Sequence, residues 1–356
     1  MKTNEREYYL ANLSQLKFAM ATSIFLSAFI FGLLLFVIVY FLQLDVFSGL
    51  LVALGGSALF ILFQYAVGPA IVAATTHLHY LKPGENPWLE STVKELADKS
   101  GIPMPKLATV PNNTPNAFTF GRTTSSATLA VHEGLLQQLN ENEVKGVIAH
   151  ELGHIKHKDY IVMTVLSALP LIAYYIAQVT LYAGAFSGGR RNNKDNSGAA
   201  IIAIGVIAFV VYIITFVIVM RLSRLREHYA DAYSAYVTGS PRELESALAK
   251  ITYGLSISPK APEGARAFYI EDPGQAKQEV QQIMDKKDEY DLDHDGVLDE
   301  RELQLAMEKE SKSTWVQMNS LFATHPPTFK RILLLREIEQ EMQTGQYSND
   351  KMYTHV

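Results

Sequence analysis

Four long segments without a charged side chain constrain the fold of this 356-residue chain more than any other feature. Asp, Glu, Lys and Arg are all missing from residues 18–44, 46–81, 160–189 and 196–220. Each segment exceeds the roughly 20 residues that a helix needs to cross the hydrocarbon core of a bilayer. The sequence therefore predicts four transmembrane helices, near residues 18–43, 49–75, 160–186 and 198–220.

The first apolar segment is expected to remain in the protein as an anchor. Residues 1–17 before it are mostly polar, and no clear small-residue cleavage site follows it. The segment is also too long for the apolar core of a signal peptide.

Four spans place the N-terminus, residues 82–159 and the region after residue 220 on one side of the membrane. The basic residues next to the spans on that side are Lys2, Arg6, Lys17, Lys82, Arg221, Arg224 and Arg226. The loop between the third and fourth spans also carries Arg190, Arg191 and Lys194. The bias is therefore incomplete, but the positive-inside rule favours the cytoplasm for the shared side. We expect a multi-pass protein of the cell membrane with cytoplasmic polar regions.

Residues 150–154 read His-Glu-Leu-Gly-His, which places His150 and His154 one turn apart on one face of a helix. Asn140 and Glu143 before them form a capping-box pattern, which predicts the start of that helix. Both imidazoles can then bind one divalent ion, and Glu151 can take a proton from water. The alternative is an amphipathic helix with two partly exposed histidines.

A catalytic zinc ion usually has three protein ligands, and the chain has no cysteine to supply one. Glu227 and Asp231 lie four residues apart just after the fourth span, on the same side of the membrane as His150. Glu227 is the candidate third ligand, and Asp231 is the candidate residue that orients a ligand from behind. The alternatives are an ordinary helical ion pair of Glu227 with Arg224 and ligation by His228.

Several ordered motifs give the chain a family resemblance. They are PNAFTFG (115–121), VHEGLL (131–136), HELGHIKHKD (150–159), RLREHYADAYSAY (224–236) and THPPTFKRI (324–332). Together they resemble the HtpX-like membrane metalloproteases, which are related to the CAAX prenyl endopeptidases. The resemblance covers roughly residues 10–270 and 313–340. It implies a mainly α fold with a small β-sheet (α+β), in which four transmembrane helices accompany a zincin-type (gluzincin) catalytic domain.

The resemblance also implies roles for individual residues. One Zn²⁺ is held by His150, His154 and Glu227, and Glu151 is the general base. The supporting residues that it implies are Asp159 and Asp231 behind the metal ligands, Asn116 beside the substrate, and His325 near the zinc. His325 either stabilises the oxyanion or caps the resting metal, and the alternative is a turn histidine held by the prolines after it.

Residues 106–131 read as short strands separated by turns. An edge strand in this segment can hold an extended peptide by adding it to the sheet. Such binding uses backbone groups and predicts broad tolerance for substrate side chains.

Residues 291–302, DLDHDGVLDERE, match the EF-hand calcium loop position by position. The predicted Ca²⁺ ligands are Asp291, Asp293, Asp295, Val297 (through its carbonyl), Asp299 and Glu302. Gly296 supplies the turn, and helical patterns flank the loop. Residues 271–310 carry 14 acidic against 5 basic side chains, a net charge of −9. A merely solvated acidic hairpin explains this charge but not the spacing.

The predicted division of the chain follows from these motifs. Residues 1–81 hold the first two spans, 82–159 the first catalytic part, 160–220 the next two spans, 221–270 the second catalytic part, 271–312 the calcium-binding insertion and 313–356 the last catalytic part.

We expect a membrane zinc endopeptidase that cleaves membrane or misfolded proteins in quality control, with calcium as a candidate modulator. The expected partners are protein substrates and the lipid bilayer, not nucleic acid. The alternatives are a CAAX prenyl-type endopeptidase and a calcium-responsive membrane scaffold with an inactive peptidase fold.

Overall fold

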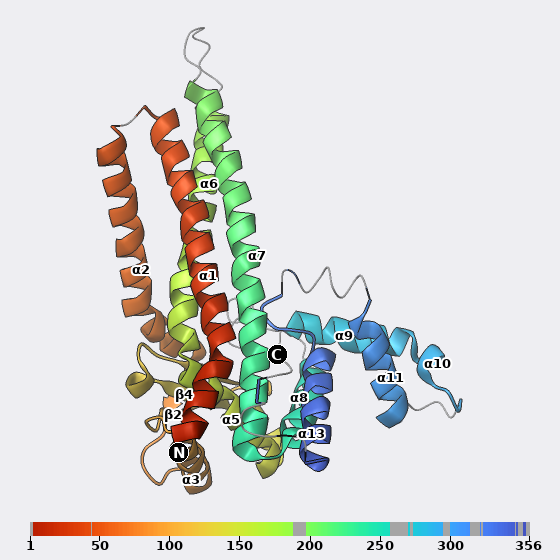
Figure 1. The fold of residues 1–356 in the computed structure, drawn as a ribbon. Coiled ribbons are helices and arrows are strands. Elements are labelled where there is room, and N and C mark those ends of the chain that lie inside the picture. The colour runs from red at the N-terminus through yellow and green to blue at the C-terminus, as the bar shows by residue number, and fades with distance from the viewer. Residues whose placement is uncertain are drawn as a thin grey trace. The chain divides into compact units, whose positions relative to one another are not determined.

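The computed structural model describes residues 3–43, 45–187, 197–256, 270, 273–294, 300–313, 321, 323–345, 347 and 352–353. Helices dominate these residues, and the four strands of a small sheet all come between α2 and α4 in the chain (Figure 1). The α-helices are α1 (Thr3–Phe41), α2 (Val46–Thr76), α3 (Pro87–Ser100), α4 (Glu133–Gln138), α5 (Glu141–His157), α6 (Asp159–Ser187), α7 (Ser197–Thr238), α8 (Pro241–Ser256), α9 (Pro273–Asp285), α10 (Lys287–Tyr290), α11 (Glu300–Ser311) and α13 (Thr328–Gln343). The strands are β1 (His79–Tyr80), β2 (Lys106–Val110), β3 (Ala117–Phe120) and β4 (Thr128–His132).

Residues 17–69 and 161–222 form one compact unit, which we call the apolar unit. It contains most of α1, α2 and α6 and the first part of α7, which run side by side (Figure 1). In the described part of the chain these are the four helices long and apolar enough to cross a membrane. The prediction of four transmembrane helices is confirmed, and the chain is a multi-pass membrane protein.

The core of the apolar unit joins three of these helices. Leu34 and Leu35 of α1 pack with Ala173 of α6 and Ala208 of α7. The alanines allow the helix backbones to approach closely, as small residues do in membrane bundles. Gln64 of α2 also donates a hydrogen bond to Ser167 of α6 at 3.3 Å.

Residues 1–16, 70–160 and 223–356 form the second unit, which we call the mixed unit. Its sheet has the strand order β1-β2-β4-β3, in which β2 and β4 are parallel and the other pairs are antiparallel. All five residues of β4 are buried. On one face of the sheet Phe118, Phe120 and Ala130 pack against Val72. The short strands predicted between residues 106 and 131 are present, and β3 lies at the edge of the described sheet.

Helix α5 begins and ends as local chemistry dictates. The side chain of Asn140 accepts a hydrogen bond from the backbone N–H of Glu143, and the Glu143 carboxylate accepts one from the N–H of Asn140. Lys158 adopts a left-handed conformation (φ 61°) and ends the helix. The chain then enters α6 at once, so Asp159 lies close to the last turn of α5.

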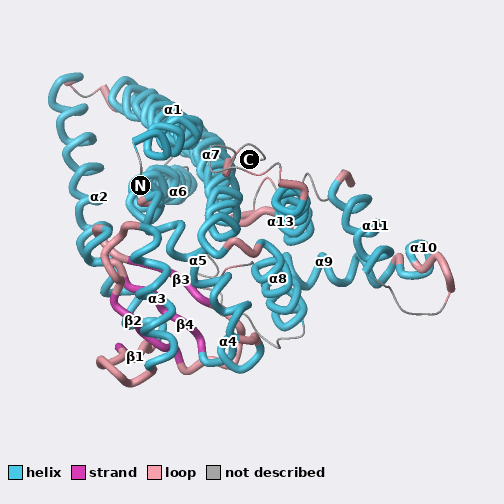
Figure 2. The backbone as a smooth tube through the Cα atoms, turned by 60° about the horizontal axis from the view of Figure 1, so that its bottom comes forward, coloured by secondary structure: helices cyan, strands magenta, loops and turns pink. Residues whose placement is uncertain are grey.

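Helix α8 lies against α5, α9 and α13 in the mixed unit (Figure 2). Two glycines of α5 permit close approach of its neighbours. A Cβ atom on Gly146 would lie 2.9 Å from the backbone nitrogen of Leu244 in α8, and one on Gly153 would lie 3.3 Å from the Cα atom of Ala230 in α7.

Candidate active site

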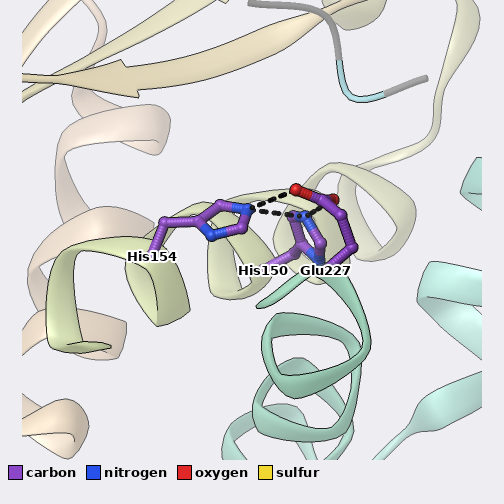
Figure 3. A group of neighbouring side chains, drawn as sticks. All are labelled: His150, His154 and Glu227. Carbon is purple, nitrogen blue, oxygen red and sulfur yellow. Dashed lines mark hydrogen bonds and ion pairs between the residues drawn. The ribbon is translucent and has the colours of Figure 1, made fainter. Parts of the chain in front are cut away.

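Helix α5 directs both histidines of the HELGH motif to one point. The Nε2 atoms of His150 and His154 lie 3.2 Å apart, and their rings are perpendicular. Figure 3 shows the two imidazoles and the Glu227 carboxylate pointing toward one another. The helical spacing of four residues accounts for this convergence.

Glu227 reaches the histidines from α7. Its Oε2 atom lies 3.3 Å from Nε2 of His150, and its Oε1 atom lies 3.5 Å from Nε2 of His154. The apolar segment ends at residue 220, but the helix continues to Thr238 and carries Glu227 with it. The structure therefore brings together the three residues that the sequence proposes as metal ligands, with their ligand atoms within 4.8 Å of one another.

The three side chains are spaced as ligands of a tetrahedral zinc ion would be. Ligand atoms about 2.1 Å from such an ion lie about 3.4 Å from one another. Here the two Nε2 atoms are 3.2 Å apart, and each lies 3.3 or 3.5 Å from one of the two oxygens of the Glu227 carboxylate. Glu227 is buried, and a buried carboxylate needs a cation or hydrogen-bond donors beside it.

A carboxylate lies behind each histidine. Nδ1 of His154 is 2.7 Å from Asp159, and Nδ1 of His150 is 2.9 Å from Asp231. A carboxylate accepts the Nδ1 proton, which leaves the Nε2 lone pair directed at the shared point. Asp159 also forms an ion pair with Arg226 at 3.1 Å.

Burial lowers the pKa of His150, but its contacts with Asp231 and Glu227 outweigh that effect and raise the pKa to about 9. A metal ion that binds Nε2 must therefore displace a proton.

Glu151 is buried beside the two histidines. Burial raises the pKa of its carboxyl group, while His154, His150 and a hydrogen bond from Thr119 lower it. Thr119 belongs to the edge strand β3, which packs on α5. The candidate base therefore contacts the edge strand of the described sheet.

Arg331, to which the sequence motifs give no predicted role, is completely buried. Its guanidinium group donates two hydrogen bonds to Asp231, at 2.8 and 2.7 Å, and its Nη2 atom lies 3.5 Å from both ring nitrogens of His150. The sequence feature that could have indicated this role is the position of Arg331 within the motif THPPTFKRI, six residues after His325. A sequence pattern alone does not show that such a residue points inward.

His325 is buried, and its Nε2 atom lies 3.9 Å from Oε1 of Glu227. Its Nδ1 atom lies 2.9 Å from the Thr324 hydroxyl. The structure therefore places His325 at the edge of the group formed by His150, His154 and Glu227.

Asn116 immediately precedes β3 and is buried. Its side-chain oxygen accepts a hydrogen bond from the backbone N–H of Ile270 at 2.9 Å. The predicted position of Asn116 is beside the substrate. In this structure its side chain holds the segment that precedes α9.

Three histidines outside this group pack in the fold. His228 of α7 does not belong to the group of three close ligand atoms. Nδ1 of His132 lies 2.9 Å from the carbonyl oxygen of Thr114. Nε2 of His157 lies 3.0 Å from the Tyr353 hydroxyl.

The predicted calcium loop is described only in part. Asp291, Asp293 and Glu302 each offer an oxygen within 4.8 Å of the others. Oε1 of Glu302 accepts backbone hydrogen bonds from Leu292 at 2.6 Å and Asp293 at 3.3 Å. Asp295, Val297 and Asp299 lie outside the described residues.

Comparisons with known proteins agree with the resemblance. The model of peptidase family M48 matches residues 83–339. The chain is 38% identical over 249 residues to the protease HtpX homolog of Methanothermobacter thermautotrophicus, which covers 68% of this chain and 91% of that protein. It is 34% identical over 326 residues to the protease HtpX homolog of Thermococcus sibiricus, and this match covers 89% of this chain and 95% of that protein.

The crystal structure of S. mikatae Ste24p is similar with a TM-score of 0.48 and 18% identity, over 94% of this chain and 66% of that chain. The chain belongs to peptidase family M48 and is a membrane metalloprotease similar to the HtpX proteases.

Proposed function

We propose that this chain is a zinc-dependent endopeptidase that cleaves membrane or misfolded proteins at the cytoplasmic face of the bilayer. The observation that carries the proposal is the convergence of His150, His154 and Glu227 beside the buried Glu151. The three side chains supply the ligand number and type of a catalytic zinc site, in which the fourth position stays open.

Zinc, when bound there, supplies a Lewis acid that polarises a carbonyl group and makes a water molecule more acidic. Glu151 takes the proton of the attacking water and passes it to the leaving amine. Its raised pKa brings the carboxyl group closer to the range in which it can both accept and donate a proton. Asp159 and Asp231 keep the histidine rings in the orientation for ligation.

His325 is the proposed donor to the oxyanion, because its Nε2 atom lies near Glu227 at the edge of the ligand group. The alternative role is a cap on the resting metal. A loss of kcat in His325→Gln with unchanged zinc affinity supports the first role, and increased basal activity supports the second.

The edge strand β3 is the proposed binding site for the substrate backbone. Its partner in the described sheet is β4, and its Thr119 contacts Glu151. An extended peptide paired with β3 would lie along the strand whose Thr119 contacts Glu151. Backbone pairing favours unfolded substrates of varied sequence, which supports a role in protein quality control.

The experiment that tests the proposed chemistry compares three proteins purified in detergent: the parent, Glu151→Gln and Glu141→Gln. Glu141 lies exposed in the first turn of the same helix and serves as the matched control. We expect the parent and the control to cleave casein, and Glu151→Gln to lose at least about a hundredfold in kcat. A chelator should abolish cleavage, and zinc should restore it. Full activity of Glu151→Gln would contradict the proposed mechanism.

The same preparations test the two alternatives. A prenyl-type endopeptidase would cleave a prenylated CAAX peptide in preference to casein. A scaffold with an inactive peptidase fold would cleave neither substrate in the presence of zinc. Both outcomes would contradict the proposed quality-control activity.

The proposed cytoplasmic orientation is testable because the chain has no natural cysteine. Lys99→Cys places a thiol in the mixed unit, and Ser48→Cys places one in the exposed first turn of α2, at the end of the second span that follows the first. A membrane-impermeant maleimide applied to intact cells should label the second variant and not the first. The reverse pattern would place the catalytic residues outside the cytoplasm.

We also propose that the insertion at residues 271–312 binds Ca²⁺. The proximity of Asp291, Asp293 and Glu302 supports this second function, together with the EF-hand spacing of the sequence. Isothermal titration should detect calcium binding to the parent and to Asp288→Asn, an exposed control, but not to Glu302→Gln. Equal activity and equal thermal stability with and without calcium, in zinc-buffered solution, would argue against a modulating role.

A further inference from the structure

Helix α13 begins without a capping side chain of its own. Its N-cap position is Pro327, which makes no side-chain hydrogen bond, and the following backbone N–H belongs to Thr328. The first N–H groups of a helix have no partner within the helix and need an acceptor when buried. Thr328 is buried, so its N–H must be satisfied from elsewhere in the fold.

Glu279 of α9 supplies that acceptor. Its Oε2 atom lies 3.0 Å from the N–H of Thr328, and its Oε1 atom accepts a hydrogen bond from Gln275 at 2.7 Å. Glu279 is itself buried. The cap of α13 therefore comes from the first helix of the predicted calcium-binding insertion.

Helix α13 connects this cap to the proposed metal site. His325 lies three residues before Thr328, and Arg331 lies one turn after the start of the helix. Arg331 donates two hydrogen bonds to Asp231, which contacts Nδ1 of His150. A shift of the first turn of α13 would therefore move the group that orients a proposed metal ligand.

A second contact joins the start of the insertion to the same arginine. Nη1 of Arg331 donates a hydrogen bond to the carbonyl oxygen of Ile270 at 2.7 Å, and Ile270 lies three residues before α9. The backbone N–H of Ile270 in turn binds the side chain of Asn116. Contacts with Arg331 and Asn116 thus hold the residue just before the insertion, and a contact with Thr328 holds Glu279 within its first helix.

We propose that Glu279 is a positioning residue for the metal centre, which caps α13 and thereby holds Arg331 against Asp231. The inference rests on the proposed zinc site and extends it, because it makes an inserted helix part of the support of the catalytic residues. Glu279 touches neither substrate nor metal and acts through α13.

The test measures zinc affinity by competition with a chromophoric chelator, together with kcat and KM for casein. The variants are Glu279→Ala, Glu279→Asp and Glu279→Gln, with Gln278→Ala on the exposed side of α9 as the control. We expect Glu279→Ala to lose roughly three- to tenfold in zinc affinity, the low end of what supporting residues of metal sites contribute. Its kcat should fall while KM stays constant, because the substrate does not contact Glu279.

Glu279→Gln should restore the parent values, because its amide oxygen can accept the same backbone hydrogen bond. Burial raises the pKa of Glu279 to about 7, so an uncharged amide is a close substitute at neutral pH. Glu279→Asp has a shorter side chain and should fall between Ala and Gln. If Glu279→Ala does not fold, the Glu279→Asp variant decides the test. Parent-like zinc affinity of Glu279→Asp would then overturn the proposal.

Equal zinc affinity and kcat in the parent and Glu279→Ala would overturn the role of Glu279 and leave the zinc site intact. Failure of the parent to bind zinc would instead contradict the proposed function itself. A loss in Gln278→Ala as large as in Glu279→Ala would show that any change in α9 disturbs the site, which also overturns a specific role for Glu279.

Discussion

Arg331 and Asp231 form a completely buried, two-pronged ion pair, with Nε–Oδ2 and Nη2–Oδ1 distances of 2.8 and 2.7 Å. The same Oδ1 atom lies 2.9 Å from Nδ1 of His150. Asp231 therefore connects a fixed positive charge to a proposed metal ligand. Planar guanidinium geometry suits this bidentate contact, and a lysine ammonium does not.

Replacement of Arg331 by Lys should break this arrangement. A single ammonium group cannot keep both hydrogen bonds to Asp231 and the one to Ile270. We expect the free energy of unfolding to fall by about 3 kcal/mol, because buried acceptors of Asp231 and Ile270 lose their hydrogen bonds. Thermal unfolding in detergent measures the effect. Arg336→Lys on the same helix is the control, and its more accessible pair with Glu245 should cost less than about 1 kcal/mol. Equal losses in both variants would contradict the special position of Arg331.

Replacement of Asp159 by Asn should weaken metal binding without removing a proposed ligand. The neutral amide holds the Nδ1 proton of His154 less strongly than the carboxylate does. We expect roughly a tenfold loss of zinc affinity, measured by chelator competition. Asp98→Asn on the exposed side of α3 is the control and should bind zinc like the parent. Parent-like affinity in Asp159→Asn would show that His154 is oriented by its packing alone.

Acidification should destabilise the protein through His157. Burial lowers the pKa of this imidazole from 6.5 to about 4. The unfolded chain therefore binds more protons between these values, so the contribution of His157 to stability is complete above about pH 6.5 and is lost as the pH falls toward 4. We expect the melting temperature to fall less between about pH 7 and pH 5 in His157→Gln than in the parent. The exposed His79→Gln is the control. The prediction fails if all three proteins show the same pH dependence.

Replacement of Gly146 by Ala should destabilise the protein, although alanine favours helices. In an open helix position this change stabilises by about 1 kcal/mol. Here the added Cβ atom would lie 2.9 Å from a backbone nitrogen of α8, so two helices must move apart. We expect a loss of about 1–3 kcal/mol in thermal unfolding. Gly56→Ala in α2 is the control, because a Cβ atom there meets nothing within 4 Å. A stabilised Gly146→Ala variant would show that α5 and α8 separate easily.

Much of the fold was predictable because its signals are local. Uncharged runs mark the spans, and the pair Asn140 and Glu143 marks the start of α5. The end of α7 was less predictable. Hydropathy shows where a span ends at residue 220, but the polar continuation of the helix to Thr238 follows from packing in the mixed unit.

The proposed metal ligands were predictable from their residue type and spacing. Of the residues that orient these ligands, the sequence indicated Asp159 and Asp231 but not Arg331 and Glu279. Arg331 and Glu279 are charged residues on helices with many other charged residues, and nothing local distinguishes them. Their burial follows from the tertiary contacts of α13 with α8 and of α8 with α9. A sequence pattern reports the period of a helix but not which polar side chain meets a partner inside the protein.

The division of the ligand group along the chain has a consequence for biogenesis. His154 and Glu227 are separated by the whole of α6 and by the apolar part of α7, both of which are long enough to cross a membrane. A nascent molecule whose third and fourth spans have not yet been inserted as a hairpin cannot bring Glu227 to the histidines. Membrane insertion must therefore precede assembly of the site. The three-residue group can form only after the third and fourth spans have returned the chain to the side on which the histidines lie.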